Sequence, residues 1–173
     1  MRLFIAIDIP EDAEQELKKA QKVLEQKGIR CPDKLHMTLK FLGGVSEDNL
    51  KKITSNLEEI HFPRFKLSLD RLDTINPNYI RVIHANVTPL TELLKLEGLI
   101  DKATDIVKRD HQFKPHITIA RIKFIEDKVK LLDKIKQIKL APIEFEVKNF
   151  HLLKSTLTKE GPIHEIVKTF ELE

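Results

Sequence analysis

Two short runs with the same polar pattern, eighty residues apart, constrain this fold more than any other feature of the sequence. Residues 35–41 read Leu-His-Met-Thr-Leu-Lys-Phe, and residues 113–121 read Phe-Lys-Pro-His-Ile-Thr-Ile-Ala-Arg. Both runs are largely apolar, which predicts two strands. Side chains two positions apart lie on the same face of a strand. Each run therefore places a histidine beside a threonine, His36 with Thr38 and His116 with Thr118.

The elements around these runs recur in the same order. Each half of the chain predicts strand, helix, His-Thr strand, helix and strand, with approximate repeats over 1–75 and 79–155 and a final strand over 163–170. The expected fold is α+β, a single two-lobed domain over 1–173 with two antiparallel-rich sheets and helices packed outside. A pseudo-twofold axis between the repeats would bring His36 and His116 face to face across a groove between the lobes.

Local signals set the expected limits of the elements. Apolar residues spaced by three or four predict a first helix that Gly28 ends, and Ser46 caps a second helix that runs to about His61. A long helix is expected from Thr88-Pro89 to about Lys108. One strand is expected over 143–153.

Composition leaves the class of binding partner open and favours a cytoplasmic location. The net charge is only +3, which permits a nucleotide or RNA partner without requiring one. The single cysteine, Cys31, excludes an internal disulfide framework and a multi-cysteine zinc site. No apolar run approaches membrane-spanning length. We expect a cytoplasmic monomer that does not contact membranes.

Two facing imidazoles are suited to proton transfer near neutral pH, one as base and one as acid. The threonine hydroxyls can donate to phosphate oxygens, and Arg121 can add positive charge. Strict alternation would turn Arg121 away from His116 with Ile117 and Ile119, so this role requires a bulge or the strand end there. The residues favour metal-independent phosphoryl transfer without a cofactor over a zinc or two-metal hydrolase.

The competing structural interpretation is that each histidine only hydrogen-bonds backbone in a half-buried strand, and the repetition of the pair argues against it. The other histidines lack a threonine two positions later. His61 and His111 lie in loop-like stretches, and His84 and His151 lie on strands. We expect these four to be surface or structural residues.

The sequence resembles a known family, the RNA 2′,3′-cyclic phosphodiesterases, also called 2′-5′ RNA ligases, within the two-histidine phosphoesterase superfamily. The resemblance covers nearly the whole chain. It comprises the opening 2–6, both His-x-Thr motifs with their flanks 41–43 and 114–121, and the tail segments 153–155 and 161–162.

The resemblance implies hydrolysis of a terminal 2′,3′-cyclic phosphate to a 2′-phosphate, with His36 as proton donor and His116 as base. It also implies that Arg121 binds phosphate and that Phe41 stacks on a base. Run in reverse, the same site would form a 2′-5′ RNA bond. His164 stands where the family usually has an aromatic residue, which bears on the base contacts rather than on the chemistry.

Two other functions stay open at this point. The first is a phosphodiesterase acting on a small cyclic nucleotide or an ADP-ribose cyclic phosphate. The second is a module that binds RNA ends without turnover, against which the two intact His-Thr pairs argue.

Overall fold

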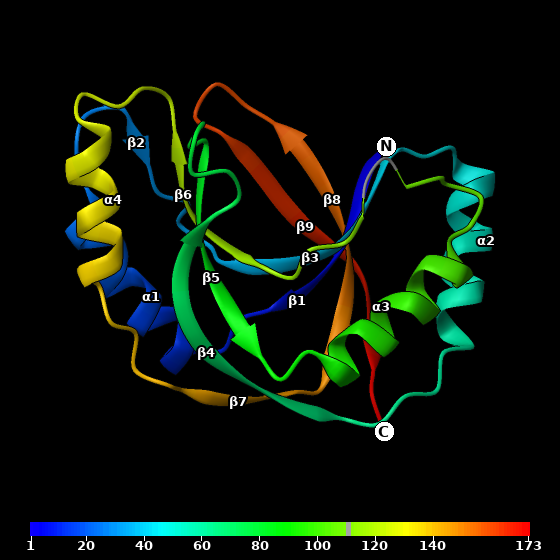
Figure 1. The fold of residues 1–173 in the computed structure, drawn as a ribbon. Coiled ribbons are helices and arrows are strands. Elements are labelled where there is room, and N and C mark those ends of the chain that lie inside the picture. The colour runs from blue at the N-terminus through cyan, green and yellow to red at the C-terminus, as the bar shows by residue number, and fades with distance from the viewer. Residues whose placement is uncertain (110–111) are drawn as a thin grey trace.

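The computed structural model describes residues 1–109 and 112–173, which form two antiparallel sheets and four helices (Figure 1). The first sheet has the order β3-β1-β8-β9 and the second β2-β6-β5-β4-β7. The first sheet contains β1 (Arg2–Asp8), β3 (His36–Gly44), β8 (Asn149–Leu157) and β9 (Pro162–Glu171). The second contains β2 (Ile29–Arg30), β4 (Phe65–Thr74), β5 (Val82–Thr88), β6 (Ile117–Ile122) and β7 (Glu144–Val147). The expected α+β class is confirmed.

The helices lie on the two outer sides of the molecule (Figure 1). They are α1 (Glu11–Leu24), α2 (Glu47–Glu58), α3 (Thr91–Ala103) and α4 (Lys128–Gln137). Helices α1 and α4 contact β6 and β4 of the second sheet, whereas α3 and α2 contact β3 and β9 of the first. Their apolar faces and one face of each sheet form the core. The opposite face of β1 carries Phe4 and Ala6, which form a separate small cluster with Leu153.

The two sheets exchange strands between the two expected repeats. β4, at the end of the first repeat, pairs with β5 at the start of the second, and β8 returns to pair with β1. The prediction of one strand over 143–153 is therefore wrong. The chain leaves the second sheet after Val147 and enters the first at Asn149, because β7 pairs with β4 while β8 pairs with β1 and β9.

Helix ends also differ from the expectations, except at Ser46; α3 begins at Thr91, with Leu90 as its N-cap, and not at Thr88-Pro89. Ser46 caps α2 by accepting a hydrogen bond from Asn49 N at 3.3 Å, as predicted. α1 ends at Leu24, before Gly28, and α3 ends at Ala103. At that end the Ile100 carbonyl accepts hydrogen bonds from both the hydroxyl and the backbone N–H of Thr104, at 2.7 and 3.0 Å. Within the described ranges, no helix is long and apolar enough to cross a membrane.

Candidate active site

β3 places His36 and Thr38 on the face of the first sheet that points away from the core. His36 is paired with Asp8 of β1, and Thr38 is paired with Ala6. The ring of His36 lies 5.3 Å from that of Phe4, a member of the small cluster on this face. Both polar side chains are half-buried. His36 and Thr38 therefore lie on one face of a strand, as the spacing predicted.

β6 holds the second pair in the same way. His116 immediately precedes the strand, and Thr118 is paired with His84 of β5. The His84 ring lies 5.3 Å from the His116 ring, the same distance that separates the Phe4 and His36 rings, although by register His84 corresponds to Ala6. Each of the two histidines thus has the ring of a residue from the neighbouring strand beside it.

A bulge in β3 brings Phe41 to the same face as His36. Ile5 pairs with Lys40 and Ala6 with Thr38, so Leu39 is an extra residue. Leu39 and Lys40 are both buried, and Phe41 is 59% exposed. The Phe41 ring lies 6.1 Å from that of Phe4. An extra residue shifts the alternation by one, which places Phe41 beside the first His-Thr pair.

The same irregularity in β6 corrects the orientation expected from strict alternation. Ile83 pairs with Ala120 and His84 with Thr118, which leaves Ile119 as the extra residue. Ile119 and Ala120 are both fully buried. Ala120 therefore faces the core, whereas strict alternation would have placed it on the face of His116. Arg121 is exposed and paired with Val82, on the face of His84. The bulge that a phosphate role for Arg121 required is present.

β3 and β6, one from each sheet, contact each other. Burial is the main cause that lowers the pKa of His36 to about 4. The positive charges of His164, Arg121 and His116 lower this pKa further, and Asp8 opposes them. His116 and Arg121, although carried by the other sheet, are therefore within electrostatic reach of His36.

His116 has a defined hydrogen bond that fixes its tautomer. Its Nδ1 lies 2.6 Å from the carbonyl oxygen of Lys114. Because a carbonyl only accepts hydrogen bonds, Nδ1 carries the proton and donates it. Neutral His116 then has its lone pair on Nε2, which suits a base.

A cavity of about 250 Å³ adjoins His36. His164 of β9 also borders it, with its ring 5.3 Å from the His36 ring and 4.8 Å from the Phe4 ring. The buried Nδ1 of His164 has no hydrogen-bond partner within the described part of the chain. The lining consists of Asp8, Ile9, Glu14, Lys34, Leu35, His36, Leu153, His164 and Ile166. None of them belongs to the second sheet, so the groove between lobes stays a prediction.

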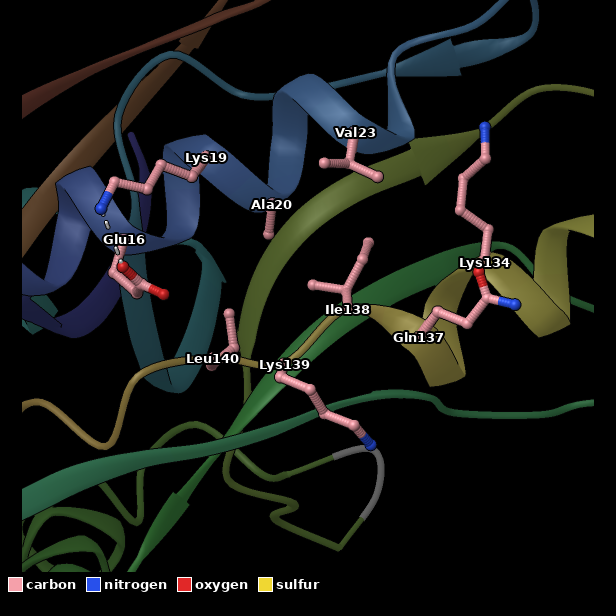
Figure 2. A pocket seen from close by; sticks show the side chains of 9 residues that line it. All are labelled: Glu16, Lys19, Ala20, Val23, Lys134, Gln137, Ile138, Lys139 and Leu140. Carbon is pink, nitrogen blue, oxygen red and sulfur yellow. Dashed lines mark hydrogen bonds and ion pairs between the residues drawn. The ribbon is translucent and has the colours of Figure 1, made fainter.

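A larger cavity, of about 340 Å³, lies elsewhere, between α1 and the end of α4 (Figure 2). Ala20 and Val23 of α1 face Ile138 and Leu140 across it, and its rim carries lysines. No candidate catalytic residue lines this cavity. The candidate site is therefore identified by its side chains, since the larger of the two cavities has no candidate catalytic residue.

The remaining histidines divide into structural and surface residues. His151 is buried between Asp8, 3.3 Å from its Nε2, and Thr169, 2.9 Å from its Nδ1. His61 is exposed and pairs with Glu173, which raises its pKa. His111 lies outside the described residues. Phe4 and His84 were not expected near the site, because their places there depend on which strands pair.

No group of three or more His, Cys, Asp or Glu side chains capable of holding a metal ion occurs among residues 1–109 and 112–173. Metal independence itself stays a prediction.

Comparisons with known proteins agree on one family. The family model described as the 2′-5′ RNA ligase superfamily matches residues 9–158. A protein of Methanocaldococcus jannaschii named RNA 2′,3′-cyclic phosphodiesterase is 43% identical over 97% of this chain and 99% of its own length. A protein of the same name from Archaeoglobus fulgidus is 34% identical, over 99% of this chain and all of its own.

Solved structures share the fold. The crystal structure of TT0787 of Thermus thermophilus matches with a TM-score of 0.82 and 28% identity, over 99% of this chain and 97% of that one. Apo E. coli LigT matches with a TM-score of 0.80 at 24% identity, over 99% and 96% of the two chains. The chain therefore belongs to the 2′-5′ RNA ligase superfamily.

Proposed function

We propose that this protein hydrolyses 2′,3′-cyclic phosphate ends of RNA to 2′-phosphates, the reaction class named for its relatives in Methanocaldococcus jannaschii and Archaeoglobus fulgidus. The observation that carries the proposal is the juxtaposition of two imidazoles from different sheets. His116 presents a free Nε2 lone pair, and His36 lies within electrostatic reach of both His116 and Arg121.

His116 acts as the base in this mechanism. Its Nε2 takes a proton from water as the water oxygen attacks phosphorus. The bond between phosphorus and the 3′ oxygen breaks, and His36 delivers a proton to that oxygen. The products are a 3′-hydroxyl and a 2′-phosphate, and the proton gained by His116 and the one lost by His36 exchange with solvent.

The low pKa of His36 fits an acid that is charged only when substrate is bound. At neutral pH a group with a pKa of about 4 is almost entirely neutral. A phosphate anion about 4 Å away contributes roughly 4 kcal/mol at an effective dielectric constant of about 20, equivalent to about 3 pKa units. The substrate itself would therefore raise the pKa of His36 toward neutrality and supply the protonated acid.

The neighbouring side chains complete the site. Thr38 and Thr118 donate hydroxyl hydrogen bonds to non-bridging phosphate oxygens, and Arg121 neutralises the charge that develops there. Phe41, more than half exposed beside Phe4, offers a face on which the terminal base stacks. With the 5′-hydroxyl of a second RNA end in place of water as the nucleophile, the same site would form a 2′-5′ bond.

The test is to map the phosphate position in products formed from nucleoside and oligonucleotide 2′,3′-cyclic phosphates, with and without EDTA. We expect 2′-phosphates only, formed at equal rates in both conditions. A 3′-phosphate product would contradict the roles of the two histidines, and a requirement for an added divalent ion would contradict the metal-independent mechanism. Tight binding without turnover would instead favour a module that binds RNA ends. Cytoplasmic location and a monomeric state also stay predictions.

A further inference from the structure

Arg30 lies directly beside the candidate phosphate ligand Arg121. The two residues are paired across β2 and β6, and both are exposed. Directly opposed residues of neighbouring antiparallel strands project from the same face of a sheet, with their Cβ atoms roughly 5 Å apart. Since Arg121 is on the face of His84, Arg30 is there too. Two guanidinium groups thus project together beside the histidines.

This pair of like charges has no protein counterion among the described residues. Neither arginine has a carboxylate within 4.0 Å in the part of the chain that the structure describes. Like charges directly opposite each other destabilise a sheet. Anionic ligands would remove that cost, and guanidinium groups match phosphate through paired hydrogen bonds.

The turn between β8 and β9 fixes where Arg30 reaches. Its guanidinium group packs against Gly161, so closely that a Cβ atom on Gly161 would lie 2.4 Å from Nη2 of Arg30. Gly161 also has a φ of +136°, which side chains rarely tolerate. Arg30 therefore spans from the second sheet to the first. Its place beside the site is set by contacts from both sheets.

Arg121 and Arg30 lie on different strands of the second sheet and therefore at different distances from the histidines. Arg121 of β6 lies three residues after Thr118, with the bulge between them, whereas β2 is the edge strand beyond β6. Neighbouring strands lie about 4.8 Å apart. Arg30 is thus one strand further than Arg121 from the reacting phosphorus between the histidines, where the next phosphate of an RNA strand would lie.

We propose that Arg30 binds the phosphate on the 5′ side of the terminal nucleotide, while Arg121 serves the reacting cyclic phosphate. This inference rests on the proposed function and extends it to the class of substrate. A nucleoside 2′,3′-cyclic phosphate lacks the second phosphate, whereas every RNA end of two or more nucleotides has it. The site is therefore built for RNA ends in preference to free cyclic nucleotides.

Binding of product-like ligands tests this without depending on turnover. Adenosine 2′-phosphate and adenosine 2′,5′-bisphosphate differ only in the 5′-phosphate. We expect the native protein to bind the bisphosphate roughly ten- to a hundred-fold more tightly in calorimetric titration, the value of a charge-assisted contact. Arg30→Gln should abolish this gain and leave the Kd of the 2′-monophosphate unchanged. Arg30→Lys should keep part of it, since it retains charge without the planar fork.

The control is Lys52→Gln, an equal loss of charge on the exposed face of α2, which should preserve the full gain. A gain retained by Arg30→Gln, or no gain in the native protein, would overturn the inference. Equal weakening of both ligands would overturn it too, by assigning Arg30 to the reacting phosphate. In steady-state kinetics, the native protein should show a higher kcat/KM for a dinucleotide 2′,3′-cyclic phosphate than for a nucleoside 2′,3′-cyclic phosphate. Arg30→Gln should lose this difference. Hydrolysis that failed while the binding pattern held would contradict the proposed function alone.

Discussion

His36 and His116 have similar sequence contexts but different surroundings. His116 has a backbone acceptor at 2.6 Å that holds its Nδ1 proton, whereas His36 is packed against the rings of Phe4 and His164. Burial and nearby positive groups lower the pKa of His36 to about 4. Such differences between two groups of one type are how a site assigns acid and base roles.

His36→Ala and His116→Ala should each reduce kcat/KM by roughly 10²- to 10⁴-fold, the usual value of a general acid or base. Both side chains are only half-buried, so circular dichroism and thermal unfolding should show intact folds. His61→Ala provides the control, because His61 is exposed and pairs with Glu173, away from the candidate site residues. Rates close to native for either site variant would return that histidine to a structural role.

Phe41→Ala should raise KM more than it lowers kcat. The ring is 59% exposed, so its loss should disturb the fold little, and base stacking contributes roughly 1–3 kcal/mol. Initial-rate kinetics on an oligonucleotide cyclic phosphate would separate the two parameters. A lower kcat with unchanged KM would show that Phe41 does not bind the base.

At the scale of elements, the bulges in β3 and β6 decide which residues reach the site. Each inserts one residue after the His-Thr pair, Leu39 in β3 and Ile119 in β6. As a result Phe41 and Arg121 turn toward the histidines, and Lys40 and Ala120 turn into the core. The buried Lys40 then anchors β3 to the end of α3. Its Nζ lies 2.7 Å from Asp101 Oδ1 and 3.1 Å from the Thr104 carbonyl oxygen.

Lys40→Met should lower the free energy of unfolding by about 1–3 kcal/mol, because a charge-assisted contact and a buried donor are lost while the apolar stem is kept. Asp101 is partly exposed and keeps Arg109 Nη2 at 3.3 Å, which limits the cost of losing Lys40. Urea unfolding would measure the change, with Lys51→Met on the exposed face of α2 as a control of equal chemistry. An unchanged midpoint for Lys40→Met would show that this contact does not hold β3 to α3.

Sequence periodicity predicted the two His-Thr strands, the class of fold and the first helix face, because these depend on local alternation and helical spacing. It could not predict which strands pair. The division at Lys148 left a trace, since Val147 and Phe150 are three positions apart and would face opposite sides of one strand, yet both are buried. The requirement for a bulge at Arg121 was deducible, but its existence depends on pairing with β5.

At the scale of the whole molecule, the site depends on two sheets that exchange strands between the sequence repeats. β8 and β9 complete the sheet of β1 and β3, and they bring His164 to His36 and Gly161 to Arg30. Neither half of the chain contains these neighbours alone. We therefore expect the two lobes to act as one catalytic unit.

The pH dependence of kcat at saturating substrate tests the central claim most directly, because it reports the ionisations of the enzyme–substrate complex. The account predicts a bell, since His116 must be neutral and His36 charged. In the native protein the two limbs belong to the coupled pair. The residual activity of His116→Ala should lose mainly the acid-side limb, and that of His36→Ala mainly the alkaline-side limb. The reverse pattern would exchange the two roles, and a flat native profile would contradict acid-base catalysis by this histidine pair.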